Sequence, residues 1–267
     1  MGLPPPALEV ARLAVGTEVG VWGQRCVPEE TAVSLTYDRE AYAVMMATPL
    51  DVEDFGIGFS CNEGIIKDLT ELAELEVCHH ELGLEVRMTL AGAAAARTLE
   101  RRRRLTGPVG CGLCGIESLA EALRELPRVP ATLKVSRHEV LEAVNALAAA
   151  QPLNRRTRAV HAAGFWRPGA GLCALREDVG RHNALDKLAG ALAREGVSAA
   201  EGMLVISSRV SIEMVQKAAL MGAGLLVAVS APTALAVRAA EAAHLTLIAI
   251  AREDGFEVFS ASHRVHT

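Results

Sequence analysis

Apolar residues along the first third of the chain form short β-prone runs that are separated by polar turns. One pair of runs flanks Asp38-Arg39-Glu40, and a second pair follows later in this part of the chain. We expect each pair to form a β-hairpin, because turn residues between two strand-like runs favour reversal of the chain. The four predicted strands are residues 32–37, 41–48, 75–79 and 83–90.

Helix-start patterns occur between and after these strands. Thr48 is placed to cap a helix, Pro49 fits its first turn, and Asp51 faces the positive end of its dipole. We expect Gly64 to close this helix. Further helices are predicted over residues 91–104, 116–126 and, after the capping box Ser136-Arg137-His138-Glu139, 137–150.

From residue 159 onward, apolar strand-like runs alternate with helical periods. The runs are apolar throughout, which predicts a sheet covered on both faces, as in α/β proteins. Pro127 and Pro130 bracket a short hinge, so we predict two domains, residues 1–130 and 131–267. The predicted strands are 159–166, 171–176, 203–207, 225–229 and 245–251, with an edge strand at 257–260, and the predicted helices are 184–194, 211–221 and 233–244.

Composition narrows the class of protein. Of the 267 residues, 51% are hydrophobic, which is enough for a large core. The net charge of -5 and the aromatic content of 3% argue against nucleic-acid binding, which favours basic patches and stacking rings. The segment MGLPPPALEV lacks the pattern of a signal peptide, and no apolar run is long enough to span a membrane. We therefore expect a cytoplasmic protein whose six cysteines are thiols.

A lone CxxC lies in the glycine-rich stretch GPVGCGLCGIESL, residues 107–119. Its spacing suits three chemistries, and the stretch by itself leaves all three open. One is a structural zinc site completed by Cys78-His79-His80, the second a redox dithiol, and the third a sulfur carrier. A carrier thiolate would be stabilised by the helix predicted to begin near Ile116. The upstream run Arg101–Arg104 suits the negative end of a helix or a phosphate contact.

Polar and basic residues follow a predicted strand in the segment Arg176-Glu177-Asp178-Val179-Gly180-Arg181-His182-Asn183. Gly180 permits close approach of a ligand to the backbone, and Arg181 and His182 stand where a helix begins. The ordinary alternative is a tight turn in which Asn183 caps the helix. Because ligands of α/β sheets bind at the carboxyl ends of strands, we interpret this segment as part of a site.

Arginine recurs after two further predicted strands, in Ser207-Ser208-Arg209 and in Arg252-Glu253-Asp254-Gly255. Either segment alone is ordinary loop chemistry. Three arginine-bearing strand ends together indicate one anionic ligand. His161 lies within a predicted strand and fits either a hydrogen-bonded core histidine or a ligand contact.

Two familiar motifs fail. Gly222-Ala223-Gly224 lacks the third glycine of a dinucleotide fingerprint and follows a helix. The chain also lacks the HxE and PCxxC pair of zinc deaminases. We interpret Cys26, Cys61, Cys173 and the pair Met45-Met46 as packing residues.

Five segments carry a resemblance to a known family: ATPLDVEDFGIGFSCNEGII, GCGLCG, EDVGRHNALDK, SSRVSIEMVQKAA and APTALAV. In this order they make the chain similar to the FdhD family, the accessory sulfurtransferases of formate dehydrogenase, over about residues 33–259. The chain departs from the family pattern in two places. Thr157-Arg158-Ala159 stands where Thr-Gly-Gly is usual, and Ser208 stands where glycine is common.

The resemblance implies a sulfur relay. Sulfane sulfur would move from a cysteine desulfurase to a persulfide on Cys111, with Cys114 as a supporting thiol. It would then pass to molybdenum of bis-molybdopterin guanine dinucleotide, a bound substrate, before that cofactor enters formate dehydrogenase. The family's contact with the cofactor corresponds to residues near the last strand of this chain. We add the other strand ends that carry arginine to this candidate site. The candidate cofactor-binding residues are Ile250, Ala251, Arg252, Glu253, Asp254, Gly255, Phe256, Arg209, Gly180, Arg181 and His182.

The same resemblance implies the architecture. A C-terminal three-layer domain like that of cytidine deaminases, without their zinc, would follow a smaller N-terminal α+β domain that ends in the CxxC loop and a helix. The resemblance further implies a homodimer, and we expect no structural metal. Two other functions stay open: a molybdenum-cofactor chaperone whose cysteines are dispensable, and a zinc-stabilised protein.

Overall fold

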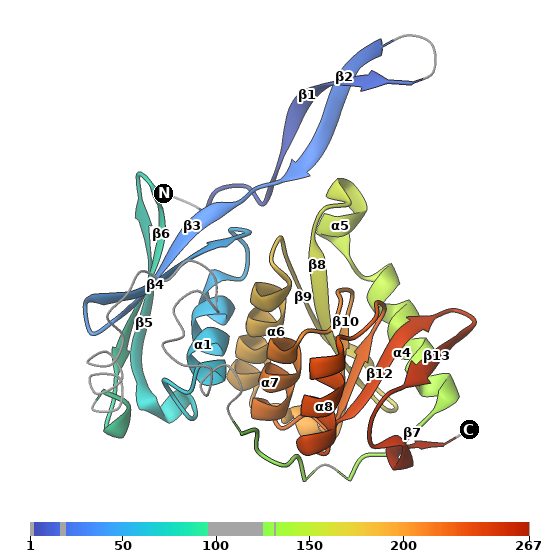
Figure 1. The fold of residues 1–267 in the computed structure, drawn as a ribbon. Coiled ribbons are helices and arrows are strands. Elements are labelled where there is room, and N and C mark those ends of the chain that lie inside the picture. The colour runs from blue at the N-terminus through green and yellow to red at the C-terminus, as the bar shows by residue number, and fades with distance from the viewer. Residues whose placement is uncertain (1–2, 17–19, 96–124, 131, 267) are drawn as a thin grey trace.

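The computed structural model describes residues 3–16, 20–95, 125–130 and 132–266 (Figure 1). Two sheets dominate it, one of four strands from the N-terminal part and one of six strands from the C-terminal part. The predicted helices at 91–104 and 116–126 fall largely outside the described residues, as do Cys111 and Cys114. The predicted domain boundary between residues 130 and 131 stays a prediction.

The four-stranded sheet contains both predicted hairpins. Its order is β4-β3-β6-β5, with β3 parallel to β6 and the other pairs antiparallel. Asp38 and Arg39 join β3 to β4 and both have positive φ, which is the backbone of the two-residue turn that matches the twist of paired strands. The bounds are β3 Thr31–Tyr37, β4 Glu40–Ala47, β5 Leu72–His80 and β6 Gly83–Leu90.

Helix α1, Val52–Asn62, covers this sheet with Phe55 and Phe59, which pack in its apolar core. Gly64 lies just beyond the helix with φ 67°, as predicted. The prediction that Thr48 caps the helix is wrong. The helix begins four residues later, after Asp51 in a left-handed conformation with no side-chain cap, because the polar groups of Thr48 are bonded elsewhere.

The C-terminal sheet has the order β13-β12-β11-β10-β8-β9. Strands β10, β11 and β12 run parallel, and the other neighbours pair antiparallel. Each predicted strand of this part is present, including the edge strand, which is β13. The bounds are β8 His161–Arg167, β9 Gly171–Asp178, β10 Met203–Ile206, β11 Leu225–Ala228, β12 Thr246–Arg252 and β13 Gly255–Val258.

Helices cover both faces of this sheet (Figure 1). On one face α6, α7 and α8 bury a core built around Leu185, Leu188 and Met214. On the other face α4 buries a second core, and its capping box between Ser136 and Glu139 is present as predicted. The α/β class is confirmed, whereas the likeness to cytidine deaminases stays a prediction. The bounds are α4 Arg137–Ala149, α6 Arg181–Glu195, α7 Ile212–Leu220 and α8 Ala234–Ala242.

Several elements were not predicted. A two-stranded ribbon, β1 Ala7–Val15 with β2 Gly20–Pro28, projects from the body of the molecule (Figure 1). Both of its faces are largely exposed, so its residues lack the alternation that identifies a half-buried strand. Helix α5, Pro152–Thr157, has only six residues. The remaining short elements are β7 Val135–Ser136, β14 Val265–His266, η1 Leu69–Glu71, η2 Ala199–Glu201 and η3 Ser262–Arg264.

Candidate functional site

Helices α1 and α6 meet at two glycines and thereby join the two sheets. A methyl group on Gly58 would lie 1.7 Å from the carbonyl oxygen of Asp186, and one on Gly190 would lie 1.9 Å from that of Asp54. The helices therefore contact backbone to backbone, an approach that only glycine permits. This contact fixes the N-terminal part against the helix whose first residues belong to the candidate site.

Buried polar groups strengthen the same interface. The ammonium of Lys187 lies 2.6 Å from Asp178, with both side chains fully buried, and donates to the carbonyl oxygen of Thr48 at 2.8 Å. The N–H of Thr48 donates to Asp178, and the hydroxyl of Thr48 accepts from the N–H of Val179. Burial lowers the pKa of Lys187, whereas the Asp178 carboxylate opposes that shift. These bonds hold the turn between β9 and α6 in one place.

Asn183 is part of this anchor and not the helix cap that the sequence suggested as one alternative. Helix α6 begins at Arg181, and Gly180 occupies the capping position. The side-chain amide of Asn183 donates to the carbonyl oxygen of Met46 at 2.8 Å and to Asp178 at 3.0 Å. Asn183 is therefore used to tie the N-terminal sheet to the start of α6.

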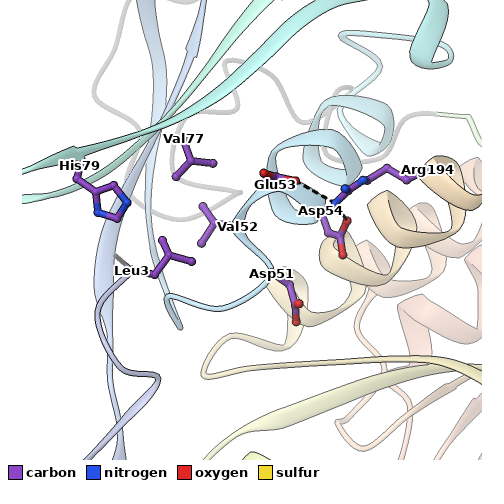
Figure 2. A pocket seen from close by; sticks show the side chains of 8 residues that line it. All are labelled: Leu3, Asp51, Val52, Glu53, Asp54, Val77, His79 and Arg194. Carbon is purple, nitrogen blue, oxygen red and sulfur yellow. Dashed lines mark hydrogen bonds and ion pairs between the residues drawn. The ribbon is translucent and has the colours of Figure 1, made fainter. Parts of the chain in front are cut away.

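A second polar group lies at the start of α1. The buried Asp54 carboxylate pairs with Arg176 and Arg194. Glu53 pairs with Arg194 as well, and Figure 2 shows Arg194 between Glu53 and Asp54. A cavity of about 350 Å³ lies beside these residues, with Val52, Val77 and His79 also in its lining (Figure 2). None of the predicted cofactor-binding residues lines it. Its carboxylates are already matched by arginines, so it does not resemble a site for an anion.

The predicted strand ends do meet at one edge of the C-terminal sheet. His161, at the start of β8, pairs with Asp178 at the end of β9. The neighbouring residue Ala162 exchanges hydrogen bonds with Ser207 at the end of β10. Arg181 and His182 form the first turn of α6 above this point, and the exposed Arg209 follows Ser207. The structure thus brings His161, Arg181, His182 and Arg209 together.

The electrostatics of this edge favour neutral histidines and an anionic ligand. Burial and the adjacent Arg181 lower the pKa of His182 to about 4. Burial, Arg181 and Arg209 also lower the pKa of His161, although Asp178 opposes the shift. At neutral pH both imidazoles are therefore uncharged beside two guanidinium groups.

Unpaired polar atoms gather at the same place. Within the described ranges, five buried side-chain nitrogen or oxygen atoms have no hydrogen-bond partner. Four of the five belong to the first turns of α6 and α7, and the fifth belongs to Trp166. The four are Nε of Arg181, Nε2 of His182, Oγ of Ser211 and Oε2 of Glu213. Because buried polar atoms are normally paired, this concentration indicates a place that a polar ligand completes.

The last predicted segment, Ile250 to Phe256, forms the end of β12, a turn and the start of β13. Ile250 has φ 53°, and its N–H donates to the carbonyl oxygen of Ser230 at the end of the neighbouring strand. Ala251 is buried and Phe256 packs on the same core. Arg252, Glu253 and Asp254 are exposed. With strands about 4.8 Å apart, the ends of β10 and β12 are about 10 Å apart, a span that only a large ligand could cover.

The four described cysteines differ in their surroundings. Cys26 and Cys61 are half-buried, in keeping with a packing role, and burial raises the pKa of Cys61 to about 11. Cys173 is exposed, so the interpretation of it as a packing residue is wrong, because it lies in a β-bulge between Leu172 and Ala174, where β9 has one residue more than β8. Met46 is likewise half exposed, on the outer face of β4, whereas Met45 packs on the core.

Sequence reasoning missed Ser211, Glu213 and Lys187. A pattern in the sequence could have drawn attention to Glu213. His182 and Asp186 are four residues apart on α6, and Glu213 and Lys217 are four residues apart on α7, which places each pair on one face of a largely buried helix. Charges on the buried face of a helix call for partners on a neighbouring element.

The described residues contain neither a metal-binding cluster nor a membrane-spanning helix. In residues 3–16, 20–95, 125–130 and 132–266, no three histidine, cysteine, aspartate or glutamate side chains are arranged to hold a metal ion. The zinc site suggested for the CxxC depends on cysteines outside these ranges and stays untested. No described helix has both the length and the apolar content that a membrane crossing requires.

Comparison with known proteins places this geometry in a family. Residues 28–266 match the model of the FdhD/NarQ family. The chain belongs to that family. It is 49% identical over 258 residues to the sulfur carrier protein FdhD of Agrobacterium fabrum, which covers 96% of this chain and 95% of the relative. It is also 51% identical over 242 residues to the protein of the same name from Brucella abortus, with 90% of each chain covered.

A solved structure shares the FdhD/NarQ fold. The crystal structure of a protein from Desulfotalea psychrophila, described as a formate dehydrogenase accessory protein, superposes with a TM-score of 0.78. The superposition covers 98% of this chain and 100% of that chain, at 23% sequence identity. At this level of identity the likeness establishes the fold alone.

Proposed function

We propose that this protein is a sulfurtransferase that carries sulfur for formate dehydrogenase as a persulfide on Cys111. The observation that carries the proposal is identity of about half of all residues, over nearly the whole chain, to proteins named sulfur carriers. The cationic edge of the C-terminal sheet supports it, because such an edge suits a large anionic cargo. Cys111 and Cys114 are the candidate thiols from the sequence.

In the first step, the Cys111 thiolate attacks the terminal sulfur of a persulfide on a cysteine desulfurase. A new S–S bond forms at Cys111, the S–S bond of the donor breaks, and the donor cysteine leaves as a thiolate. The step therefore needs no external oxidant. Cys61 is poorly suited to this role, since its pKa of about 11 keeps it protonated at neutral pH.

In the second step, the terminal sulfur passes to molybdenum of bis-molybdopterin guanine dinucleotide, which is bound as substrate. Reducing this sulfur to sulfide takes two electrons. Cys114 can supply them by attacking the inner sulfur of Cys111, which releases sulfide and leaves a Cys111–Cys114 disulfide. A cellular thiol reductant must then reduce the disulfide, as in ordinary thiol–disulfide exchange.

The described residues fit the polyanionic part of this cargo. Arg181 and Arg209 supply two positive charges, and Nε of Arg181 is a donor that has no acceptor among the described residues. The first turn of α6 adds backbone N–H groups to the same place. The turn of Arg252 to Gly255 is the second candidate contact, farther along the edge. We also propose that the protein acts as a homodimer in the cytoplasm.

A complementation experiment tests the role of Cys111. In a strain that lacks its own sulfur carrier, Cys111→Ser should abolish formate dehydrogenase activity, while the exposed Cys173→Ser should leave it unchanged. Activity retained by Cys111→Ser would contradict persulfide transfer and favour the alternative, a cofactor chaperone without covalent chemistry. Cys173→Ser is the matched control because it removes a thiol that solvent can reach.

A further inference from the structure

His182 and Glu213 face each other across the first turns of α6 and α7. The distance from Nε2 of His182 to Oε2 of Glu213 is 3.9 Å, which is beyond hydrogen-bond range. Both atoms are buried, and neither has a hydrogen-bond partner of ordinary geometry in the part of the chain that is described. The nearby hydroxyl of Ser211 helps to lower the pKa of Glu213. The two side chains keep some contact with solvent, at 34% and 18% exposure. The pair is thus open, although a small movement would close it.

The charges around His182 come from three directions. On its own helix lies Arg181, on α7 lie Glu213 and Lys217, and at the start of β8 lies His161. Burial and all of these except Glu213 lower the pKa of His182. Glu213 alone raises it, which is not enough to charge the imidazole while the site is empty.

The side chains around His182 and Glu213 carry only a small net charge. Lys217 is matched by Asp186, at 2.8 Å and 3.0 Å, and Asp178 is matched by Lys187. Glu63 also lies 3.8 Å from Lys217. Arg181, Arg209 and Glu213 therefore leave at most about one net positive charge for a ligand. The diphosphate of the proposed cargo carries more negative charge than this, so the positive charge of these side chains does not balance it.

We infer that His182 and Glu213 form a proton-accepting pair, in which an anionic ligand binds together with a proton on His182 and Glu213 accepts the new N–H. The ligand class is a diphosphate, as found in a guanine dinucleotide, and in this respect the inference rests on the proposed function. His182 is the group that adapts the charge of the site to its ligand. Glu213 is a positioning residue that acts through His182.

Proton uptake gives the binding a defined pH dependence. Because His182 has a higher pKa in the complex than in the empty site, binding is strongest at low pH and weakens as the pH rises through the pKa of the complex. Between about 4, the pKa of the empty site, and the pKa of the complex, each pH unit weakens binding by up to about tenfold. Phosphate groups titrate near pH 6 with the opposite effect, so variants are needed to separate the two.

Calorimetry of the full-length protein with GDP and with inorganic diphosphate tests the inference. Titration in two buffers of different ionisation enthalpy yields the number of protons taken up per ligand bound. At about pH 6.5 the wild type should take up close to one proton more than His182→Asn, which keeps the size and polarity of the ring but cannot be charged. Glu213→Gln should reduce the uptake and weaken binding severalfold, with GDP and diphosphate affected alike.

The chain offers a matched control in a second histidine–glutamate pair. His138 and Glu142 are 4.0 Å apart on the exposed face of α4, and His138→Asn should leave the proton count unchanged. Wild type that binds either ligand with the same proton count as His182→Asn would overturn the inference and leave the proposed function standing. Wild type that binds neither ligand would likewise overturn the inference, whereas the proposed function is decided separately by the activity of Cys111→Ser. Circular dichroism of each variant identifies any loss of fold.

Discussion

The contact between α1 and α6 is the clearest place to test whether the two sheets are locked together. Replacing Gly58 by alanine puts a methyl group 1.7 Å from the carbonyl oxygen of Asp186, and the next atoms lie in the backbone of Gly190 and Asp186 as well. Backbone atoms cannot rotate away, so the helices would have to separate by about 1.5 Å to restore ordinary contact.

Such a separation would cost more than the clash alone. Overpacking of this kind typically costs about 1–3 kcal/mol. The hydrogen bonds that cross the interface from Thr48 and Asn62 have lengths of 2.7–3.1 Å, so the same movement would carry them past bonding distance. At about 1 kcal/mol for each of the four bonds lost, the total destabilisation should reach about 5–7 kcal/mol.

Thermal unfolding followed by circular dichroism measures the effect. For a chain of this size about 1 kcal/mol shifts the Tm by about 2–4 °C, so Gly58→Ala should lower it by about 10 °C or more. Gly23→Ala is the matched control, because no atom lies within 4 Å of the added methyl group. It should move the Tm by about one degree or less.

The sign of the change in Tm shows whether the added methyl group clashes with the neighbouring helix. Where no clash exists, alanine in a helix is about 1 kcal/mol more favourable than glycine. A Gly58→Ala protein with an unchanged or raised Tm would therefore refute the close approach of the two helices. It would also remove the reason for expecting the start of α6 to be held by the N-terminal part.

Three further predictions concern buried charge, thiol reactivity and a helix cap. Lys187→Met should destabilise the protein by about 3–5 kcal/mol in urea unfolding because it leaves Asp178 buried without its cation, and adding Asp178→Asn should recover part of the loss. Cys61 should react with iodoacetamide far more slowly than Cys173 at pH 7.5, because the thiol of Cys61 stays protonated until the pH approaches 11. Its reaction should become faster toward that pH. Equal rates for the two cysteines in a peptide-mass assay would contradict the burial of Cys61. Hydrogen bonds from Ser136 hold the pKa of Glu139 below its ordinary value of 4.5, so Glu139→Ala should cost about 0.5–1 kcal/mol of stability at pH 7. This cost should fade as the pH drops through the lowered pKa, because the carboxylate is then protonated. A difference in stability that persists in acid unfolding would argue against the capping box.

Much of the fold could be predicted from local sequence. The strands and helices of the C-terminal sheet were found because their apolar runs and caps agree with the final structure, as at Ser136 and Glu139. The ribbon of β1 and β2 could not be found this way, because it buries little surface and so carries no alternation. The cap at Thr48 failed because the hydroxyl that would cap the helix accepts a hydrogen bond from the N–H of Val179, far away in the sequence.

The candidate site was predictable only in part. Arginines at strand ends were visible in the sequence, since the loop after a strand is a local feature. The facing of His182 and Glu213 was not, because 31 positions separate them along the chain and their proximity depends on how α6 packs beside α7. The same holds for Lys187, whose partners include a backbone carbonyl of the N-terminal part.

Peptide mass spectrometry shows whether Cys111 carries transferable sulfur, on which the proposed function depends. The protein is incubated with a cysteine desulfurase and cysteine, digested without reducing agent, and each cysteine peptide is weighed. One added sulfur atom is expected on the peptide that contains Cys111, absent when cysteine is omitted, and none on the peptide that contains Cys61. A Cys111 peptide that stays unmodified while the desulfurase itself is loaded with sulfur would contradict it.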